Sequence, residues 1–303
     1  MNEICAIIVT YNRPELLCRC VENLLKQDYS LDILIYDNHS SLDTKGMLLE
    51  HELLKENVTY YYADTNTGGA GGFHNAMKMA IERDMYCALW LMDDDGYPVK
   101  TNTLSTIVEA WERLEQKACI LNSLVVCDVD TLRLSFSLDR EYDGNVMSSK
   151  AVDGLLENLL SPFNGTFIPT SVIKKMGYPI KEFFVYGDEK EYTLRAKSKG
   201  ISLYTVVDSI YWHPTTVGKT KKLLNFQISI GNVSLWKTYC KARNTMYYTK
   251  KYSGAKRCII KIVRMYLGCF FDDDKKILKF RETTRGIYDG LKGDFSRKLD
   301  LSK

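Results

Sequence analysis

The first half of the chain alternates apolar segments of strand length with longer stretches whose apolar residues repeat at helical spacing. The expected strands are Glu3–Thr10, Leu31–Tyr36, Val58–Ala63, Cys87–Met92 and Cys119–Val126. The helices expected between them are one that starts at Pro14, then Leu42–Leu54, Gly71–Arg83 and Thr101–Gln116. This alternation predicts an α/β fold in which helices cover both faces of a mostly parallel sheet. Such sheets bind ligands beyond the carboxyl ends of their strands.

The second half of the chain is less regular. An alternating segment, Leu132–Arg140, is expected to form a hairpin with the stretch around Val146. A helix is expected at Asp188–Ser198 and a strand at Ser202–Val207. The last expected helices are Phe226–Lys251, Ala255–Phe271 and Lys275–Lys292.

Charge is distributed unevenly along a chain whose net charge is only +3. From Cys240 to the end there are 17 basic and 7 acidic side chains, so the rest of the chain is mildly acidic. We therefore expect an α/β domain over residues 1–220 and a basic, mainly helical region over residues 221–303. Tryptophan and tyrosine are interleaved with its basic residues, which suits peripheral binding to an anionic membrane surface. The alternative is a packing helix with solvated lysines, and the lack of a nucleic-acid module argues against a nucleic-acid partner.

The sequence also bears on the cellular compartment. It contains no apolar run near the roughly 20 residues that span a bilayer, and its N-terminus lacks the basic start and cleavage site of a signal peptide. The nine cysteines include no C-x-x-C pair, so we expect reduced thiols rather than a disulfide or zinc framework. Both features predict a cytoplasmic protein, whose oligomeric state, homo-oligomers included, stays open.

Three consecutive carboxylates, Asp93, Asp94 and Asp95, follow an expected apolar strand. Carboxylates this close repel one another, and a hard divalent cation removes that cost, because Mg²⁺ and Mn²⁺ take oxygen ligands and bridge phosphate oxygens. The first and third residues of such a turn can face one site, and His213 is a candidate third ligand. The alternatives are a solvated acidic loop and a histidine that only packs or hydrogen-bonds.

Two further segments carry chemistry. Asn66–Gly72 is glycine-rich and precedes an expected helix, so its backbone and the helix N-terminus suit a phosphate. It is neither the dinucleotide fingerprint nor a P-loop, and the alternative interpretation is a flexible turn.

Asp188, Glu189 and Glu191 fall at an expected helix start, where the helix dipole alone favours acids. The chemical interpretation is that one of them is a general base for an acceptor hydroxyl.

Together these motifs resemble the inverting family 2 glycosyltransferases of the GT-A fold. Cys5–Arg13 is similar to that family's opening strand and loop, and Asp37 to its uracil-reading aspartate. The glycine-rich, triple-aspartate, acidic-helix and Trp-His motifs follow in the family's order, so the resemblance covers roughly residues 3–215. The style of the motifs is closest to bacterial galactofuranosyltransferases and rhamnosyltransferases.

The resemblance implies a nucleotide-sugar site whose uridine pocket would be lined by Thr10, Arg13 and Asp37. The wider donor site would add residues of the glycine-rich and acidic segments, namely Asn66, Gly69, Asp93 and Asp94. A metal ion, Mn²⁺ or Mg²⁺, would be held by Asp93, Asp95 and His213 and would bind the donor diphosphate.

The resemblance also implies a single inverting displacement. Counting back from Arg195, the base position falls on Glu189, where the family usually has aspartate, so Asp188 and Glu191 stay open. The family's acceptor segment has no clear match, and Phe163–Phe167 is the candidate for it. The implied reaction transfers galactofuranose from UDP-galactofuranose to a lipid-linked or polysaccharide acceptor, in bacterial cell-surface glycan synthesis at the inner face of the membrane.

Three other functions were weighed. A rhamnosyltransferase that uses dTDP-rhamnose would carry the same motifs. A non-catalytic subunit of a glycan-assembly complex would have lost a metal or base residue, whereas every motif position here holds a chemically able side chain. A nucleotidyltransferase would need a glycine-rich basic loop after the first strand, where this chain has Tyr11–Pro14.

Overall fold

The computed structural model describes residues 3–136, 150–158, 163–215, 219–223, 226–230, 233–271 and 275–301. The chain forms two compact units. The first comprises Met1–Pro179 and Ala196–Thr215, and the second comprises Ile180–Arg195 and Thr216–Lys303. The second unit therefore combines the C-terminal part of the chain with a segment from its middle. The functional division after residue 220 stays a prediction.

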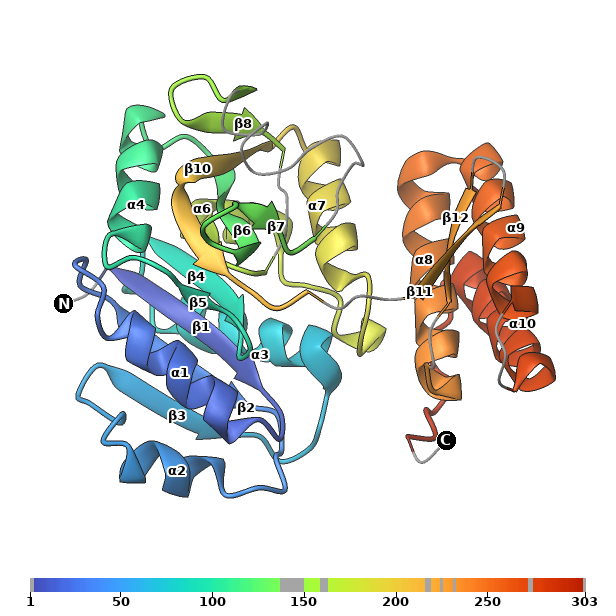
Figure 1. Cartoon of the computed structure of the whole chain (residues 1–303), viewed down its shortest axis with the longest axis horizontal. Helices are drawn as coiled ribbons and strands as arrows, with labels where there is room; N and C mark the ends of the chain where they lie inside the picture. The colour runs from blue at the N-terminus through green and yellow to red at the C-terminus, as the bar shows by residue number, and fades with distance from the viewer. Residues whose placement is uncertain are drawn as a thin grey trace. The chain divides into compact units, whose positions relative to one another are not determined.

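Strands and helices alternate through the first unit (Figure 1). Its strands are β1 (Ile4–Thr10), β2 (Asp32–Asp37), β3 (Val58–Tyr62), β4 (Ala88–Asp93), β5 (Tyr97–Pro98), β6 (Cys119–Asp128), β7 (Arg133–Leu134), β8 (Leu155–Glu157), β9 (Thr166–Pro169) and β10 (Ser202–Trp212). Its helices are α1 (Pro14–Leu24), α2 (Thr44–Glu50), α3 (Gly68–Glu82), α4 (Thr103–Arg113) and α6 (Thr170–Met176). The expected α/β architecture is confirmed, with element ends shifted by a few residues.

The strands form one sheet whose main path is β3-β2-β1-β4-β9-β6-β10-β5. The first four strands are parallel to one another and β10 is parallel to β6, but β9 runs antiparallel to both β4 and β6. Two parallel groups are thus joined by one antiparallel strand. In the first group Thr10 pairs with Asp37 and Val9 with Asp93, so β1, β2 and β4 end at one level. This register places the polar residues of three strands along one edge.

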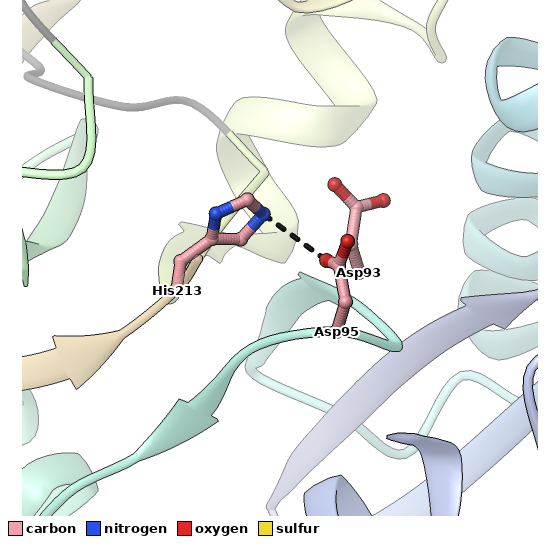
Figure 2. A group of neighbouring side chains, drawn as sticks. All are labelled: Asp93, Asp95 and His213. Atoms are coloured by element: carbon pink, nitrogen blue, oxygen red, sulfur yellow. Dashed lines mark ion pairs between the residues drawn. The ribbon is translucent and has the colours of Figure 1, made fainter. Parts of the chain in front are cut away.

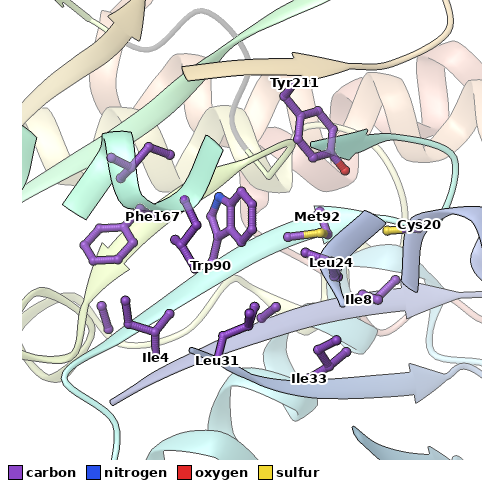
Figure 3. Close-up of a cluster of buried hydrophobic side chains, with 14 of the residues drawn as sticks. Ile4, Ile8, Cys20, Leu24, Leu31, Ile33, Trp90, Met92, Phe167 and Tyr211 are labelled. Carbon is purple, nitrogen blue, oxygen red and sulfur yellow. The ribbon is translucent and has the colours of Figure 1, made fainter. Parts of the chain in front are cut away.

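Both faces of the sheet are covered. On β1, the alternate residues Ile4, Ala6 and Ile8 pack into one buried cluster with α1, α2 and α4 (Figure 3). Val9 faces the other way, toward α3, where a Cβ built on Gly72 would lie 2.5 Å from Val9 Cγ1. Burying one such aliphatic side chain contributes about 1.5–3 kcal/mol, so the register of β1 is strongly specified.

Two expectations about secondary structure need correction. The strand expected to end at Val207 continues to Trp212, through a register shift between Val206 and Ile210. The polar pair Asp208-Ser209 falls in that shift and interrupts the apolar pattern. The helix expected to start at Phe226 starts instead at Leu235.

Residues 226–230 belong to an antiparallel pair of strands, β11 (Lys219–Leu223) and β12 (Phe226–Ile230). The sequence of β12 alternates apolar and polar residues with a period of two, which is a strand signal that the helical assignment overlooked. The expected hairpin partner around Val146 lies outside the described residues. Of the expected hairpin segment, β7 is described, and it pairs with β6.

The second unit is mainly helical. A 3₁₀ turn (Lys181–Phe183) leads to α7 (Asp188–Ser198), which starts in this unit, and the later helices are α8 (Leu235–Ser253), α9 (Ala255–Phe271) and α10 (Lys276–Lys292). The contact between α8 and α10 is close because α10 carries glycine at two positions that face α8. A Cβ on Gly290 would lie 2.1 Å from the carbonyl oxygen of Arg243, and one on Gly286 would lie 2.5 Å from that of Tyr239.

All nine cysteines are unpaired, and each is buried or half-buried. Burial raises the pKa of Cys5 to about 12 and that of Cys119 to about 11. These two thiols are therefore poorly ionised near neutral pH. Within the described part of the chain, no helix has both the length and the apolar content needed to cross a bilayer.

Candidate functional site

Three potential metal ligands converge at the ends of β4 and β10. Asp93 is the last residue of β4, Asp95 lies in the loop after it, and His213 directly follows β10. One ligand atom from each lies within 4.8 Å of the other two (Figure 2). The two-residue strand β5 explains the convergence, because Tyr97 pairs with Trp212 and ties the acidic loop to the end of β10.

The ring of His213 presents Nε2 to Asp95. Its Nδ1 lies 2.7 Å from the carbonyl oxygen of Pro214, which can only accept, so Nδ1 carries the proton. In the neutral imidazole the lone pair is therefore on Nε2, which lies 3.1 Å from Oδ1 of Asp95. Burial lowers the pKa of His213, but the carboxylates of Asp95 and Asp93 outweigh burial and hold that pKa above its ordinary value. The site thus favours a positive charge at this point.

Two oxygen atoms of this cluster are incompletely satisfied by the described residues. Oδ1 of Asp95 is buried and, although close to His213, receives no aligned hydrogen bond from them. Oδ1 of Asn164 is also buried without a donor there, while Nδ2 of Asn164 lies 3.5 Å from Oδ2 of Asp93. Buried oxygens are costly unless a donor or a cation reaches them. Two carboxylates and one imidazole nitrogen form a donor set that fits Mn²⁺ or Mg²⁺.

The middle carboxylate of the triple turns back toward β1. Asp94 is buried, and its two oxygens accept hydrogen bonds from Thr10 Oγ1 at 2.8 Å and Arg13 Nη1 at 3.1 Å. The same Arg13 nitrogen lies 2.8 Å from Oδ2 of Asp95. Burial raises the pKa of Asp94 to about 6, against the opposing effect of Arg13 and Thr10. Asp94 therefore anchors the acidic loop, and its expected contact with the donor stays a prediction.

The expected uridine-pocket residues lie at the same edge of the sheet. Asp37 is fully buried, and its carboxylate accepts hydrogen bonds from Tyr60 Oη at 2.6 Å and the Ser40 backbone N–H at 2.8 Å. Thr10 is also buried, whereas the side chain of Arg13 is 51% exposed. Of the three, Arg13 is the one whose charged group is open to a ligand. Their roles in binding uridine stay predictions.

The glycine-rich segment forms the entry into α3, which begins at Gly68. Asn66 Oδ1 accepts the Gly68 N–H at 2.8 Å, so Asn66 shapes the turn itself. A Cβ on Gly71 would lie 2.6 Å from Thr67 Oγ1, so internal packing already requires that glycine. A Cβ on Gly69 would meet nothing within 4 Å, so packing does not explain this glycine and the space beside it is open.

The candidate base residues belong to the second unit and are described with it. Asp188 is buried, and burial raises the pKa of its carboxyl to about 6. Glu189 is half-buried in the first turn of α7, and its carbonyl oxygen accepts a hydrogen bond from Thr193 Oγ1. Glu191 is fully buried, and its two carboxylate oxygens contact Arg195 Nη2 at 2.6 Å and Tyr252 Oη at 2.7 Å.

Two site features were missed by sequence reasoning. Tyr60 donates a hydrogen bond to Asp37, and nothing in the sequence pattern of β3 indicated that contact. Asn164 lies in the candidate acceptor segment, yet the structure places its side chain next to Asp93, and Phe163 of the same segment packs in the interior against Phe73. Both contacts depend on which strands are neighbours, which local patterns do not encode.

Comparisons with known proteins match this chain to one family. The family model described as Glycosyl transferase family 2 matches residues 5–152. The chain is 30% identical over 232 residues to galactofuranosyltransferase GlfT1 of Mycolicibacterium smegmatis, which covers 73% of this chain and 74% of the relative. It is 29% identical over 231 residues to the Mycobacterium tuberculosis protein of the same name, with 74% of each chain covered.

Among solved structures, the fold is similar to that of GalNAc-T7 with UDP, GalNAc and Mn²⁺. The TM-score is 0.59 at 13% identity, over 96% of this chain and 56% of the other. At that identity the likeness concerns the fold alone, and it confirms the expected GT-A architecture.

Proposed function

Because this chain belongs to glycosyltransferase family 2 and is a glycosyltransferase, we propose that it transfers galactofuranose from UDP-galactofuranose in a metal-dependent, inverting reaction. The convergence of Asp93, Asp95 and His213 at the ends of two strands is the observation that carries the metal-dependent part. Similarity to galactofuranosyltransferases over about three quarters of the chain supports the choice of sugar.

In this proposal Asp93, Asp95 and His213 hold Mn²⁺ or Mg²⁺. The bound ion supplies Lewis-acid stabilisation of the phosphoryl oxygens of the departing nucleoside diphosphate. The hydrogen bond from Nδ1 of His213 to Pro214 keeps the lone pair of Nε2 facing the site. Arg13 and Thr10 hold Asp94 and thereby fix the loop that carries the other two aspartates.

The base takes the proton of the acceptor hydroxyl while that oxygen bonds to the anomeric carbon and the bond to the diphosphate breaks. Glu189 is our first candidate, because it is half-buried at the start of α7. Asp188 is the second, since its raised pKa suits a group that exchanges protons near neutral pH. We assign Glu191 an anchoring role instead, because both of its oxygens are already engaged.

The acceptor is proposed to be a lipid-linked or polysaccharide glycan reached at the inner face of the bacterial cell membrane. Helix α9 supports such peripheral docking, since its Ile259, Val263 and Phe270 lie on one helical face and are 63%, 52% and 67% exposed. Four basic and no acidic residues occur in this helix. An exposed apolar stripe with basic neighbours suits the headgroup region of an anionic bilayer.

Two experiments test this function. Purified protein is mixed with Mn²⁺, an acceptor extract and a panel of UDP-, dTDP- and GDP-sugars, and nucleoside diphosphate release is measured. UDP-galactofuranose should give the fastest release, and a preference for dTDP-rhamnose would replace the proposed sugar. Co-sedimentation with anionic vesicles should weaken with salt and with Val263→Ser, but not with the control Val129→Ser, which changes an exposed valine of the first unit. Equal binding by both variants would contradict docking through α9.

A further inference from the structure

The segment that leads into α7 has an unusual backbone. Phe184 and Tyr186 each have φ of 64°, and Gly187 has φ of 86°. Residues other than glycine seldom adopt the left-handed region, and they persist there only when their surroundings hold them. The candidate bases Asp188 and Glu189 directly follow this segment, so whatever holds its backbone also sets where they lie.

Asn244 of α8 binds three carbonyl oxygens of this segment. It is fully buried, and its Nδ2 lies 3.0, 2.9 and 2.7 Å from the carbonyl oxygens of Phe183, Val185 and Tyr186, which share its two N–H donors. Its Oδ1 accepts from Nε of Arg243 at 2.9 Å, which fixes the orientation of the amide. A buried group that binds several carbonyls of one short segment constrains their peptide planes directly.

Arg243 strengthens the same arrangement. It is 1% exposed, and its Nη2 donates to the carbonyl oxygens of Glu182 and Phe183 at 2.8 and 3.0 Å. The chain from Glu182 to Tyr186 is thus bound through its backbone by two neighbouring side chains of α8, so the contact does not depend on the side chains of that segment.

Two more residues of α8 extend the contact into α7. Tyr248 and Tyr252 follow Asn244 at intervals of four residues and therefore lie on the same helical face. Tyr248 packs against Gly187, where an added Cβ would lie 3.0 Å from Cε1 of its ring. Tyr252 donates its hydroxyl to the fully buried carboxylate of Glu191. One face of α8 thus contacts the segment before the candidate bases and the turn after them.

We propose that this face, made of Asn244, Tyr248 and Tyr252, positions the general base, and that Asn244 is a positioning residue for sugar transfer. The inference rests on the proposed function, in which Asp188 or Glu189 is the base. It gives this one face of α8 a role in positioning the base, whereas the sequence suggested membrane binding or packing for the basic C-terminal region.

The test compares Asn244→Asp with Met246→Ala. Asn244→Asp keeps the size and Oδ1 of the side chain but removes its N–H donors, whereas Met246 is buried on the same helix among Ala242 and Ile287. We expect Asn244→Asp to lower kcat about 10- to 100-fold with an unchanged KM for the donor, because small misplacements of a reacting group are costly. Met246→Ala should lower the melting temperature while kcat stays near that of the wild type.

The outcomes separate the two proposals. An equal loss of kcat in both variants, or a normal kcat in Asn244→Asp, overturns the positioning role. If Asn244→Asp fails to fold, Tyr252→Phe serves instead, since it removes only one hydroxyl, and it should lower kcat with an unchanged donor KM. A wild-type protein that transfers no sugar overturns the proposed function and this inference with it.

Discussion

The acidic cluster of the first unit and the buried glutamate of the second are stabilised in different ways. Glu191 is fully buried, and both of its oxygens have donors, from Arg195 and Tyr252. In the acidic cluster, Asp95 has one oxygen bound by Arg13 and another that lies beside His213 without an aligned hydrogen bond. The described residues alone satisfy both oxygens of Glu191, but they leave one oxygen of Asp95 without an aligned hydrogen bond.

The difference distinguishes a carboxylate that stabilises the fold from carboxylates that are available to a ligand. A carboxylate whose oxygens all accept hydrogen bonds is not stabilised further by a ligand. Substituting that carboxylate removes an acceptor from each buried donor that contacts it. A group of carboxylates with an oxygen left over instead gains from a cation, at some cost to the empty protein. We therefore propose that the acidic loop binds a ligand and that Glu191 belongs to the framework, and the following changes test this proposal.

The largest effect is expected when the acidic cluster loses its cation. EDTA should abolish sugar transfer, and Mn²⁺ or Mg²⁺ should restore it, because no other group in the cluster can replace a Lewis acid on the diphosphate. Asp95→Asn should have the same effect without lowering the melting temperature. Full activity in the presence of a chelator would contradict the proposal that the acidic cluster binds a metal ion needed for transfer.

The second effect concerns the base. Glu189→Gln keeps the size of the side chain and removes its basicity, so turnover should fall about 10²- to 10⁴-fold while UDP binding is retained. Asp188→Asn is the matched variant. If it abolishes turnover and Glu189→Gln does not, the base is Asp188.

The third effect is on stability. Glu191→Ala should lower the free energy of unfolding by about 3–5 kcal/mol, because it leaves the guanidinium of Arg195 without its buried partner. The control is Glu82→Ala, since Glu82 pairs with Lys78 at the surface, and exposed pairs are worth about 0–1 kcal/mol. Urea unfolding of both variants measures the difference, and equal losses would contradict the anchoring role.

The fourth effect depends on pH. Burial raises the pKa of Asp188 in the folded protein to about 6, so ionising it destabilises the fold increasingly from about pH 4 to pH 6 and by a constant amount above. Asp188→Asn should therefore raise the free energy of unfolding by up to about 3 kcal/mol at pH 8. The gain should be much smaller near pH 4, and a gain that does not change with pH would contradict the assignment.

The smallest effect is expected from Tyr252→Phe. This change removes one hydroxyl donor from Glu191 and leaves Arg195 in place, so the free energy of unfolding should fall by about 1–2 kcal/mol. The control is Tyr288→Phe, because Tyr288 is 56% exposed. An effect as large as that of Glu191→Ala would mean that Tyr252, rather than Arg195, is the main partner of the carboxylate.

Much of the first unit could be predicted from its sequence. The strands and helices up to β6, except the two-residue β5, follow from local periodicity over a few residues. The end of β4 at Asp93 could also be anticipated, because a polar triple stops an apolar strand. His213 could be named only as a candidate third ligand, a role that the family resemblance also implies, because its approach to Asp95 depends on β5 pairing across more than a hundred residues.

The second unit was harder to predict for a physical reason. The alternation of β12 gave a usable signal, but the role of Asn244 did not, because one buried asparagine in an amphipathic helix has no distinctive pattern. Its function depends on three carbonyl oxygens about sixty residues earlier in the chain. Backbone conformations such as those of Phe184 and Tyr186 also leave no mark in the sequence, since neither residue type favours them.

Seven of the nine cysteines are buried, and this burial has a practical consequence for spectroscopy. Maleimides react with thiolates, and buried thiols of raised pKa are protected from them by both access and ionisation. The seven buried thiols should therefore react slowly with such reagents, which leaves the half-buried Cys87 and Cys127 as the ones to replace. In a chain with Cys87 and Cys127 replaced by serine, a single cysteine placed at Ile277, which is 85% exposed on α10, would then carry a fluorophore selectively.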